Sequence, residues 1–102
     1  MTAYVVIICD KTKDLPESVI KAAMAEYAAI AREAPLHGLE ILASRTSKLR
    51  ILEGAGAEVV VVMRFPTMSD ALAWHNSDAY QRAIPHRAAV ADYRTLLVEG
   101  VE

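Results

Sequence analysis

Hydrophobic positions along the chain follow two different periods, and each change of period predicts a new element. The runs 4–9 and 58–65 are apolar at nearly every position and rich in β-branched residues, which predicts strands with both faces covered. A third stretch, 15–34, repeats its apolar residues at the 3.6-residue spacing of an amphipathic helix. The chain therefore begins as a strand and a helix, and a second strong strand follows later.

Polar residues and prolines mark the ends of the predicted helix. Asp14 with Glu17 resembles a capping box, and Pro16 is tolerated in a first turn because its missing N–H would have no partner there. Pro35 and Gly38 are typical of the residues that follow a helix. We therefore expect this helix to end near residue 34.

The middle of the chain predicts a short strand, turns and a second helix start. The strand is expected at 39–44, and 49–52 could continue it beyond a bend before a glycine-rich turn at 53–56. Thr67, followed three residues later by Asp70, is the pattern of a helix cap. A helix should therefore begin directly after the second strong strand.

The last third of the chain predicts helical segments and a closing strand. A second helix is expected over about 68–76, and the chain then makes a short capped turn around Tyr80. Pro85 allows a further helical turn as far as Ala91, and 93–99 forms the last strand.

This β-α-β-β-α-β order predicts an α+β fold of the ferredoxin-like type. Both helices should cover one face of a four-stranded antiparallel sheet. The opposite face would be solvated if the strands alternated apolar with polar residues, but the two strong strands do not alternate. We therefore expect a homodimer in which two copies pack through the sheet face opposite the helices.

Composition narrows the class of protein further. A chain of 102 residues that is 54% hydrophobic is a single domain, 1–102, with more apolar surface than one small core can hide. The net charge of -2 includes no basic block, so nucleic acid is not an expected partner. Cys9 is the only cysteine and is expected to be a small buried hydrophobe. No apolar run approaches the ~18 residues of a membrane span, and a cytoplasmic protein is expected.

The most distinctive stretch is 65–80, which leaves a strand, turns and enters a helix. Its marker residues are Phe65, Pro66, Thr67, Met68, Ala71, Ala73, Trp74, Asn76, Ser77 and Tyr80. This pattern resembles the signature of a small bacterial family, "domain of unknown function thirteen-thirty", of the dimeric α/β-barrel superfamily. The resemblance extends over nearly the whole chain. It implies a dimeric ferredoxin-like barrel without an established reaction; relatives with this architecture include cofactor-free monooxygenases, muconolactone isomerase-like enzymes and haem-binding peroxidases.

Aromatic residues are the first candidates for a binding site. Tyr27, Trp74 and Tyr80 could line a pocket for a flat organic molecule, with Asn76 of the same motif as a polar contact. The alternative is that Trp74 and Tyr80 only fix the second helix to the sheet. A cavity of at least ~300 Å³ beside Trp74 would favour the pocket.

Histidines are the side chains that normally titrate near neutral pH, so a general base is expected among them. His75, beside Trp74 on a predicted helix, is the best placed, although a surface position is the alternative. No two of the three histidines have the i, i+4 spacing of a helical metal site, and no axial haem ligand is singled out. We expect no metal and no cofactor.

Arginines are the candidates for binding a carboxylate. Arg45, Arg64 and Arg87 could each hold an anion through a bidentate fork. Arg64 interrupts the valine-rich strand, and an ion pair between subunits is its alternative role. The resulting hypothesis is a dimer that binds a small aromatic or carboxylated molecule between sheet and helices, with cofactor-free isomerase or monooxygenase-like chemistry open. The alternative is a non-catalytic binding or interaction module.

Overall fold

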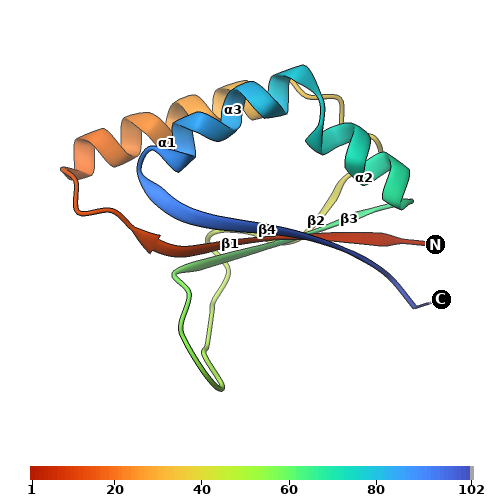
Figure 1. The fold of residues 1–102 in the computed structure, drawn as a ribbon, viewed down its shortest axis with the longest axis horizontal. Coiled ribbons are helices and arrows are strands. Elements are labelled where there is room, and N and C mark those ends of the chain that lie inside the picture. Colours follow the sequence, from red (N-terminus) through yellow and green to blue (C-terminus); the bar gives the residue numbers. More distant parts are fainter. Residues whose placement is uncertain (102) are drawn as a thin grey trace.

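The computed structural model describes residues 1–101 and forms two layers, a sheet with all of its helices on one side (Figure 1). Residues 1–101 contain four strands and three helices. In order they are β1 (Ala3–Thr12), α1 (Glu17–Ala31), β2 (Glu40–Ala43), β3 (Val59–Phe65), α2 (Met68–His75), α3 (Asp78–Ala88) and β4 (Ala91–Glu99).

The sheet is antiparallel throughout and has the strand order β2-β3-β1-β4. Its register places Val5 beside Met63 on the face toward the helices and Val6 beside Val62 on the opposite face. Because side chains alternate along a strand, each strand contributes to both faces. The predicted ferredoxin-like α+β fold is confirmed.

The helix starts differ from the sequence patterns in one case and match them in another. α1 begins after Pro16, and no side chain caps it, so the Asp14 and Glu17 capping box is wrong. Thr67 does cap α2, since its Oγ1 accepts a hydrogen bond of 3.0 Å from the backbone N–H of Asp70. A capping box requires a Ser, Thr, Asp or Asn side chain at the N-cap position, as well as the right spacing. In α1 that position is Pro16, which has no such side chain and whose ring fixes the turn into the helix.

The second predicted helix is followed by a longer third one, where the sequence indicated only isolated turns. Ser77 separates the two, because its Oγ donates to the Trp74 carbonyl and accepts from the Tyr80 N–H at the start of α3. α3 then continues through Pro85 as far as Ala88. Buried Ala79 and Ala83 let α3 lie along α1, and this packing stabilises the helix beyond its proline.

The connection between β2 and β3 is a long loop that extends away from the sheet on the side opposite the helices (Figure 1). Residues 49–52 belong to this loop and not to a continued strand. Leu52 is 85% exposed there. Before β2, Gly38 has a positive φ, and a Cβ at that position would lie 2.7 Å from the ring of Pro66, so only glycine fits without a shift.

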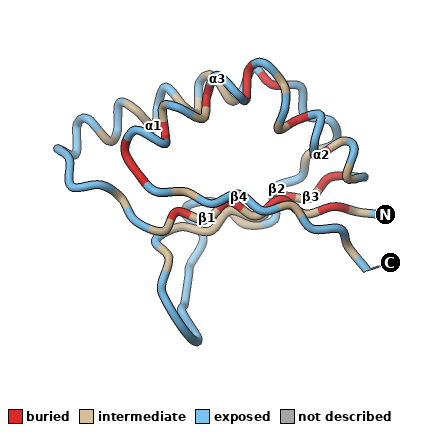
Figure 2. The backbone as a smooth tube through the Cα atoms, viewed as in Figure 1, coloured by how far each residue is buried: buried red, intermediate tan, exposed pale blue. Residues whose placement is uncertain are grey.

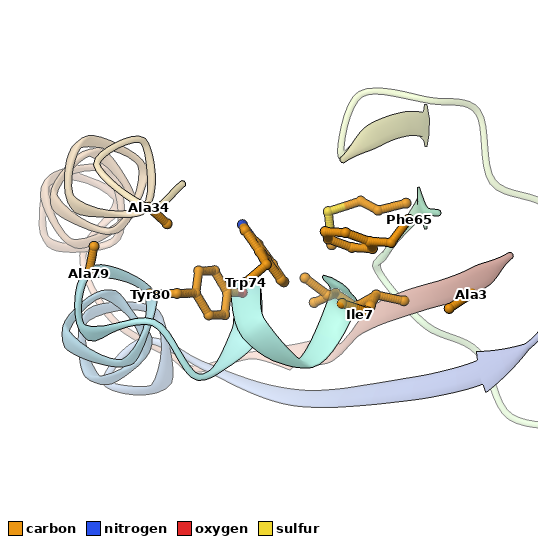
Figure 3. Close-up of a cluster of buried hydrophobic side chains, with 10 residues drawn as sticks. Ala3, Ile7, Ala34, Phe65, Trp74, Ala79 and Tyr80 are labelled. Atoms are coloured by element: carbon orange, nitrogen blue, oxygen red, sulfur yellow. The ribbon is translucent and has the colours of Figure 1, made fainter. Parts of the chain in front are cut away.

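Buried residues concentrate between the sheet and the helices, mainly beneath α2 and α3 (Figure 2). Trp74 is the centre of this packing. Its ring centroid lies 4.1 Å from that of Tyr80 and 5.5 Å from that of Phe65, and Figure 3 shows the indole between these two rings. Cys9 is buried on the same side, as expected.

The opposite face of the sheet has an apolar centre and also carries the ion pairs of Arg64 with Glu40 and of Arg94 with Asp10. It is only partly covered in a single chain. Val6 and Val62 are half-buried there, while Leu96 and Val98 on β4 are about half exposed. Among residues 1–101, no helix is long and apolar enough to cross a membrane.

Candidate functional site

α1 covers a cavity instead of packing on the sheet. The helix lies along α3, but none of its Cα atoms comes within 8 Å of a strand Cα, and none of its residues is fully buried. Side chains from α1, α3 and the sheet enclose the resulting cavity of about 260 Å³. The cavity does not reach the volume of at least ~300 Å³ that is expected to favour a pocket beside Trp74, so any occupant must be small.

Apolar side chains form most of the cavity wall, and polar groups are few. The lining residues include Tyr27 from α1, Trp74 from α2, and Tyr80 and Arg87 from α3, four of the residues that the sequence proposed for binding. The structure thus brings together side chains that are 60 positions apart in the chain. Trp74 belongs both to the packed core and to the cavity wall.

Arg87 is the buried charged residue of this site, with only 4% of its surface exposed. Its Nη1 donates to the Tyr80 hydroxyl at 2.6 Å and to the Tyr27 hydroxyl at 3.0 Å, and its Nη2 donates to Thr95 Oγ1 at 3.2 Å. The two tyrosine hydroxyls are themselves 2.7 Å apart. The guanidinium also lies over the Tyr93 ring, 4.7 Å from its centroid.

All of these partners of Arg87 are neutral. Among the ion pairs of residues 1–101, none includes Arg87, and its Nε has no hydrogen-bond partner. Burial raises the pKa of Tyr80 well above its usual range, the largest cause being desolvation, so this hydroxyl keeps its proton beside the cation. The cavity therefore combines apolar walls with one buried positive charge that has no charged partner within this part of the chain, and the exposed Arg45 also lies at its wall.

Sequence reasoning missed several of the cavity residues. Met24, Tyr93 and Thr95 contact the cluster or the cavity, and Ser44 lies at the β2 end of the wall. Arg45, an arginine that the sequence did propose, lies beside Ser44 at the same wall. Arg87 was proposed, and its proximity to Tyr80 also had a signal: Tyr80, Ala83 and Arg87 are three and four positions apart, which places them on one face of a helix.

His75 does not line this cavity. Its half-buried ring borders a second, smaller cavity of about 190 Å³ between α2 and β4, together with Thr95, Leu72 and Leu97. The side-chain nitrogen of Gln81 donates to the His75 backbone carbonyl at 2.7 Å. The base proposed from the sequence is thus separate from the larger cavity, although Thr95 connects the two through its bond to Arg87.

Arg64 and Asn76 lie outside the larger cavity as well. Arg64 is on the opposite sheet face, where it pairs with Glu40 of the neighbouring strand β2. The predicted alternative of an ion pair therefore has a partner within the same chain. Asn76 is the exposed residue that follows α2. Within residues 1–101, no three histidine, cysteine or acidic side chains gather closely enough to bind a metal.

The family of the chain follows from its sequence pattern. Residues 2–101 match the family described as "Domain of unknown function (DUF1330)", and the chain belongs to that family. The resemblance noted from residues 65–80 is thereby confirmed. Among curated proteins, none matches significantly.

Solved structures with the same fold come from several bacteria. A ferredoxin-like protein of the DABB family from Mesorhizobium loti has a TM-score of 0.65 at 10% identity, covering 99% of this chain and 98% of its own. A dimeric ferredoxin-like protein of unknown function from Bacteroides fragilis has a TM-score of 0.62 at 11% identity, with coverage of 97% and 96%. SnoaB, a cofactor-independent oxygenase from Streptomyces nogalater, has a TM-score of 0.55 at 12% identity, with coverage of 99% and 93%. At these identities the likeness concerns the fold alone.

Proposed function

We propose that the protein binds a small aromatic or carboxylated organic molecule in the cavity beneath α1. The observation that carries this proposal is the cavity itself, about 260 Å³ in volume and walled by Tyr27, Trp74 and Tyr80. Aromatic walls with a few polar groups are what small-molecule sites consist of. A core that was built only for stability would be filled by its own side chains.

A thermal-shift screen against small aromatic acids, phenols and quinones tests this proposal. A ligand that binds only the folded state stabilises it by about 2.7 kcal/mol at a hundred times its Kd. Ala31 lines the cavity and Ala25 is exposed on the same helix. Ala31→Phe should abolish the shift, and Ala25→Phe should retain it. If no compound shifts the wild-type melting temperature, small-molecule binding is wrong.

A homodimer through the outer sheet face is the second part of the proposal. Its support is the apolar face that includes Val6, Val62 and Val98, together with a dimeric solved structure of the same fold. Val98 is 56% exposed in one chain, so Val98→Asp should be tolerated by the monomer and should disrupt the dimer. Light scattering measures the mass, and Val19→Asp on α1 is the matched control. A wild-type monomer at micromolar concentration would contradict the dimer.

Catalysis is a separate proposal that depends on His75. Its support is the ring of His75 at the wall of the smaller cavity, beside the Thr95 that also contacts Arg87. A cofactor-free isomerase or oxygenase of this kind would use His75 as a general base. Because His75 lines the smaller cavity and not the larger one, its substrate must extend into the smaller cavity. For a substrate of that kind, His75→Ala should abolish turnover without changing affinity. An unchanged rate, or no turnover by the wild type, favours the non-catalytic binding module.

A further inference from the structure

We infer that the ligand of the larger cavity is a small monocarboxylate, and that its anionic group accepts the hydrogen bond of the Tyr27 hydroxyl with Arg87 behind it. This inference rests on the proposed binding function and specifies the charge and chemical class of the molecule. Three observations support it: the buried charge of Arg87 has no charged partner among the described residues, the two tyrosine hydroxyls have one proton left to donate, and the cavity is small.

The charge balance of the cluster is incomplete in the protein alone. Arg87 is 96% buried, and Tyr27, Tyr80 and Thr95, which accept its hydrogen bonds, are all neutral. Buried charges in proteins are normally paired, because neutral acceptors return only part of the lost hydration. An arginine guanidinium does not lose its proton at physiological pH, so it cannot avoid the cost by becoming neutral. An anion in the adjoining cavity would complete the pair.

The protons of the two tyrosine hydroxyls also favour a ligand that accepts a hydrogen bond. The two tyrosine hydroxyls hold two protons, and their mutual hydrogen bond of 2.7 Å uses one of them. Tyr80 is completely buried, whereas Tyr27 is half-buried at the cavity wall. The arrangement that fits is donation by Tyr80 to Tyr27, which leaves the Tyr27 proton for the cavity. Tyr27 then accepts from both Arg87 and Tyr80, and this polarises its O–H toward a ligand oxygen.

The cavity limits the size of the molecule. Its volume of about 260 Å³ and its mainly apolar wall suit one aromatic ring with a single charged substituent. Benzoate is the simplest probe of this kind, and benzamide is its neutral counterpart with nearly the same shape. Arg45 also lies at the wall and is exposed, so it is the competing cation.

Titration calorimetry with benzoate and benzamide at neutral pH tests the inference. We expect benzoate to bind at least about tenfold more tightly than benzamide, because a hydrogen bond to a charged group is worth about a factor of ten or more. Tyr27→Phe and Arg87→Met should each remove this preference. Tyr93→Phe removes a hydroxyl at the same cavity, and Arg82→Met removes an exposed arginine of the same helix; both should retain the preference.

The outcomes separate the inference from the proposed function. Equal binding of benzoate and benzamide, or a screen that finds only neutral ligands, overturns the carboxylate while small-molecule binding stands. Loss of the preference in Arg45→Met but not in Arg87→Met also overturns it. If no compound of the screen binds, both proposals are wrong. Circular dichroism checks that each variant is folded. If Arg87→Met does not fold, Tyr27→Phe, which deletes only one oxygen, still tests the inference.

Discussion

The two ends of the helical layer cover the same sheet in different ways. Beneath α2, Trp74 packs against Phe65 and Tyr80 with 5% of its surface exposed. The side chains of α1 are at most half-buried, and beneath them lies a cavity whose wall includes the buried cation Arg87. The first region is packed around Trp74 and leaves only the smaller cavity of about 190 Å³ toward β4, whereas the second has a larger cavity and a buried charge without a charged partner in residues 1–101. The difference indicates that the packing around Trp74 contributes most of the stability, while the space beneath α1 can accept a ligand at little cost to the fold.

Truncation of the packed end should have the largest effect. Trp74→Ala is expected to lower the free energy of unfolding by about 3 to 5 kcal/mol, because a large buried ring leaves a cavity that the core cannot close. Leu72→Ala, on the exposed side of the same helix, is the control and should cost less than about 1 kcal/mol. Urea denaturation measures both. Similar losses for the two variants would contradict the central role of Trp74.

Tyr80 joins the two regions, and its removal should have an intermediate effect that depends on pH. Tyr80→Phe is expected to cost about 1 to 3 kcal/mol near neutral pH, since it removes a buried acceptor for Arg87. The folded protein raises the pKa of Tyr80, so its contribution is complete below the unfolded pKa of about 10. The free energy of unfolding should then fall as the pH rises above that value, because only the unfolded chain releases this proton.

Urea denaturation near neutral pH and at about pH 11 tests this sign. Burial also raises the pKa of Tyr93, which adds to the wild-type decrease and remains in the variant. The decrease in stability with pH should therefore be smaller in Tyr80→Phe than in the wild type. An equal decrease in both proteins would show that Tyr80 is not titrating as the structure implies.

Truncation at the hollow end should have the smallest effect. Met24 is half-buried at the cavity wall, and its sulfur lies 3.8 Å from the Tyr93 hydroxyl. Met24→Ala enlarges a space that is already present, so we expect a loss of about 1 kcal/mol or less. A loss as large as that of Trp74→Ala, in the same denaturation experiment, would mean that α1 is as tightly packed as α2.

The same contrast explains which features the sequence could predict. The valine-rich strand, the Thr67 cap and the element order depend on local patterns, and the structure confirms them. α3 was predicted only as separate turns, because a proline normally interrupts a helix and local rules do not include the packing against α1. The length of this helix was therefore predicted less well than its helical character.

The structure brings Tyr27, Trp74, Tyr80 and Arg87 to one cavity, an arrangement that the sequence alone could not give. Trp74, Tyr80 and Tyr27 are aromatic residues at helical spacing, which sequence alone cannot divide between core and pocket. Arg87 near a helix C-terminus would normally interact with the helix dipole at the surface. Its burial depends on the register that places Thr95 of β4 and Tyr27 of α1 beside it, and this register is a property of the whole fold.

We propose that the buried charge of Arg87 serves a ligand and not the fold. Urea denaturation of the wild type and of Arg87→Met, with and without saturating benzoate at one protein concentration, tests it directly. We predict that the ligand-free variant is within about 1 kcal/mol of the wild type, because the lost hydrogen bonds are offset by the removal of an unpaired buried ion. Benzoate should stabilise only the wild type. A ligand-free variant that loses about 3 kcal/mol or more, with no effect of benzoate on the wild type, would contradict the claim.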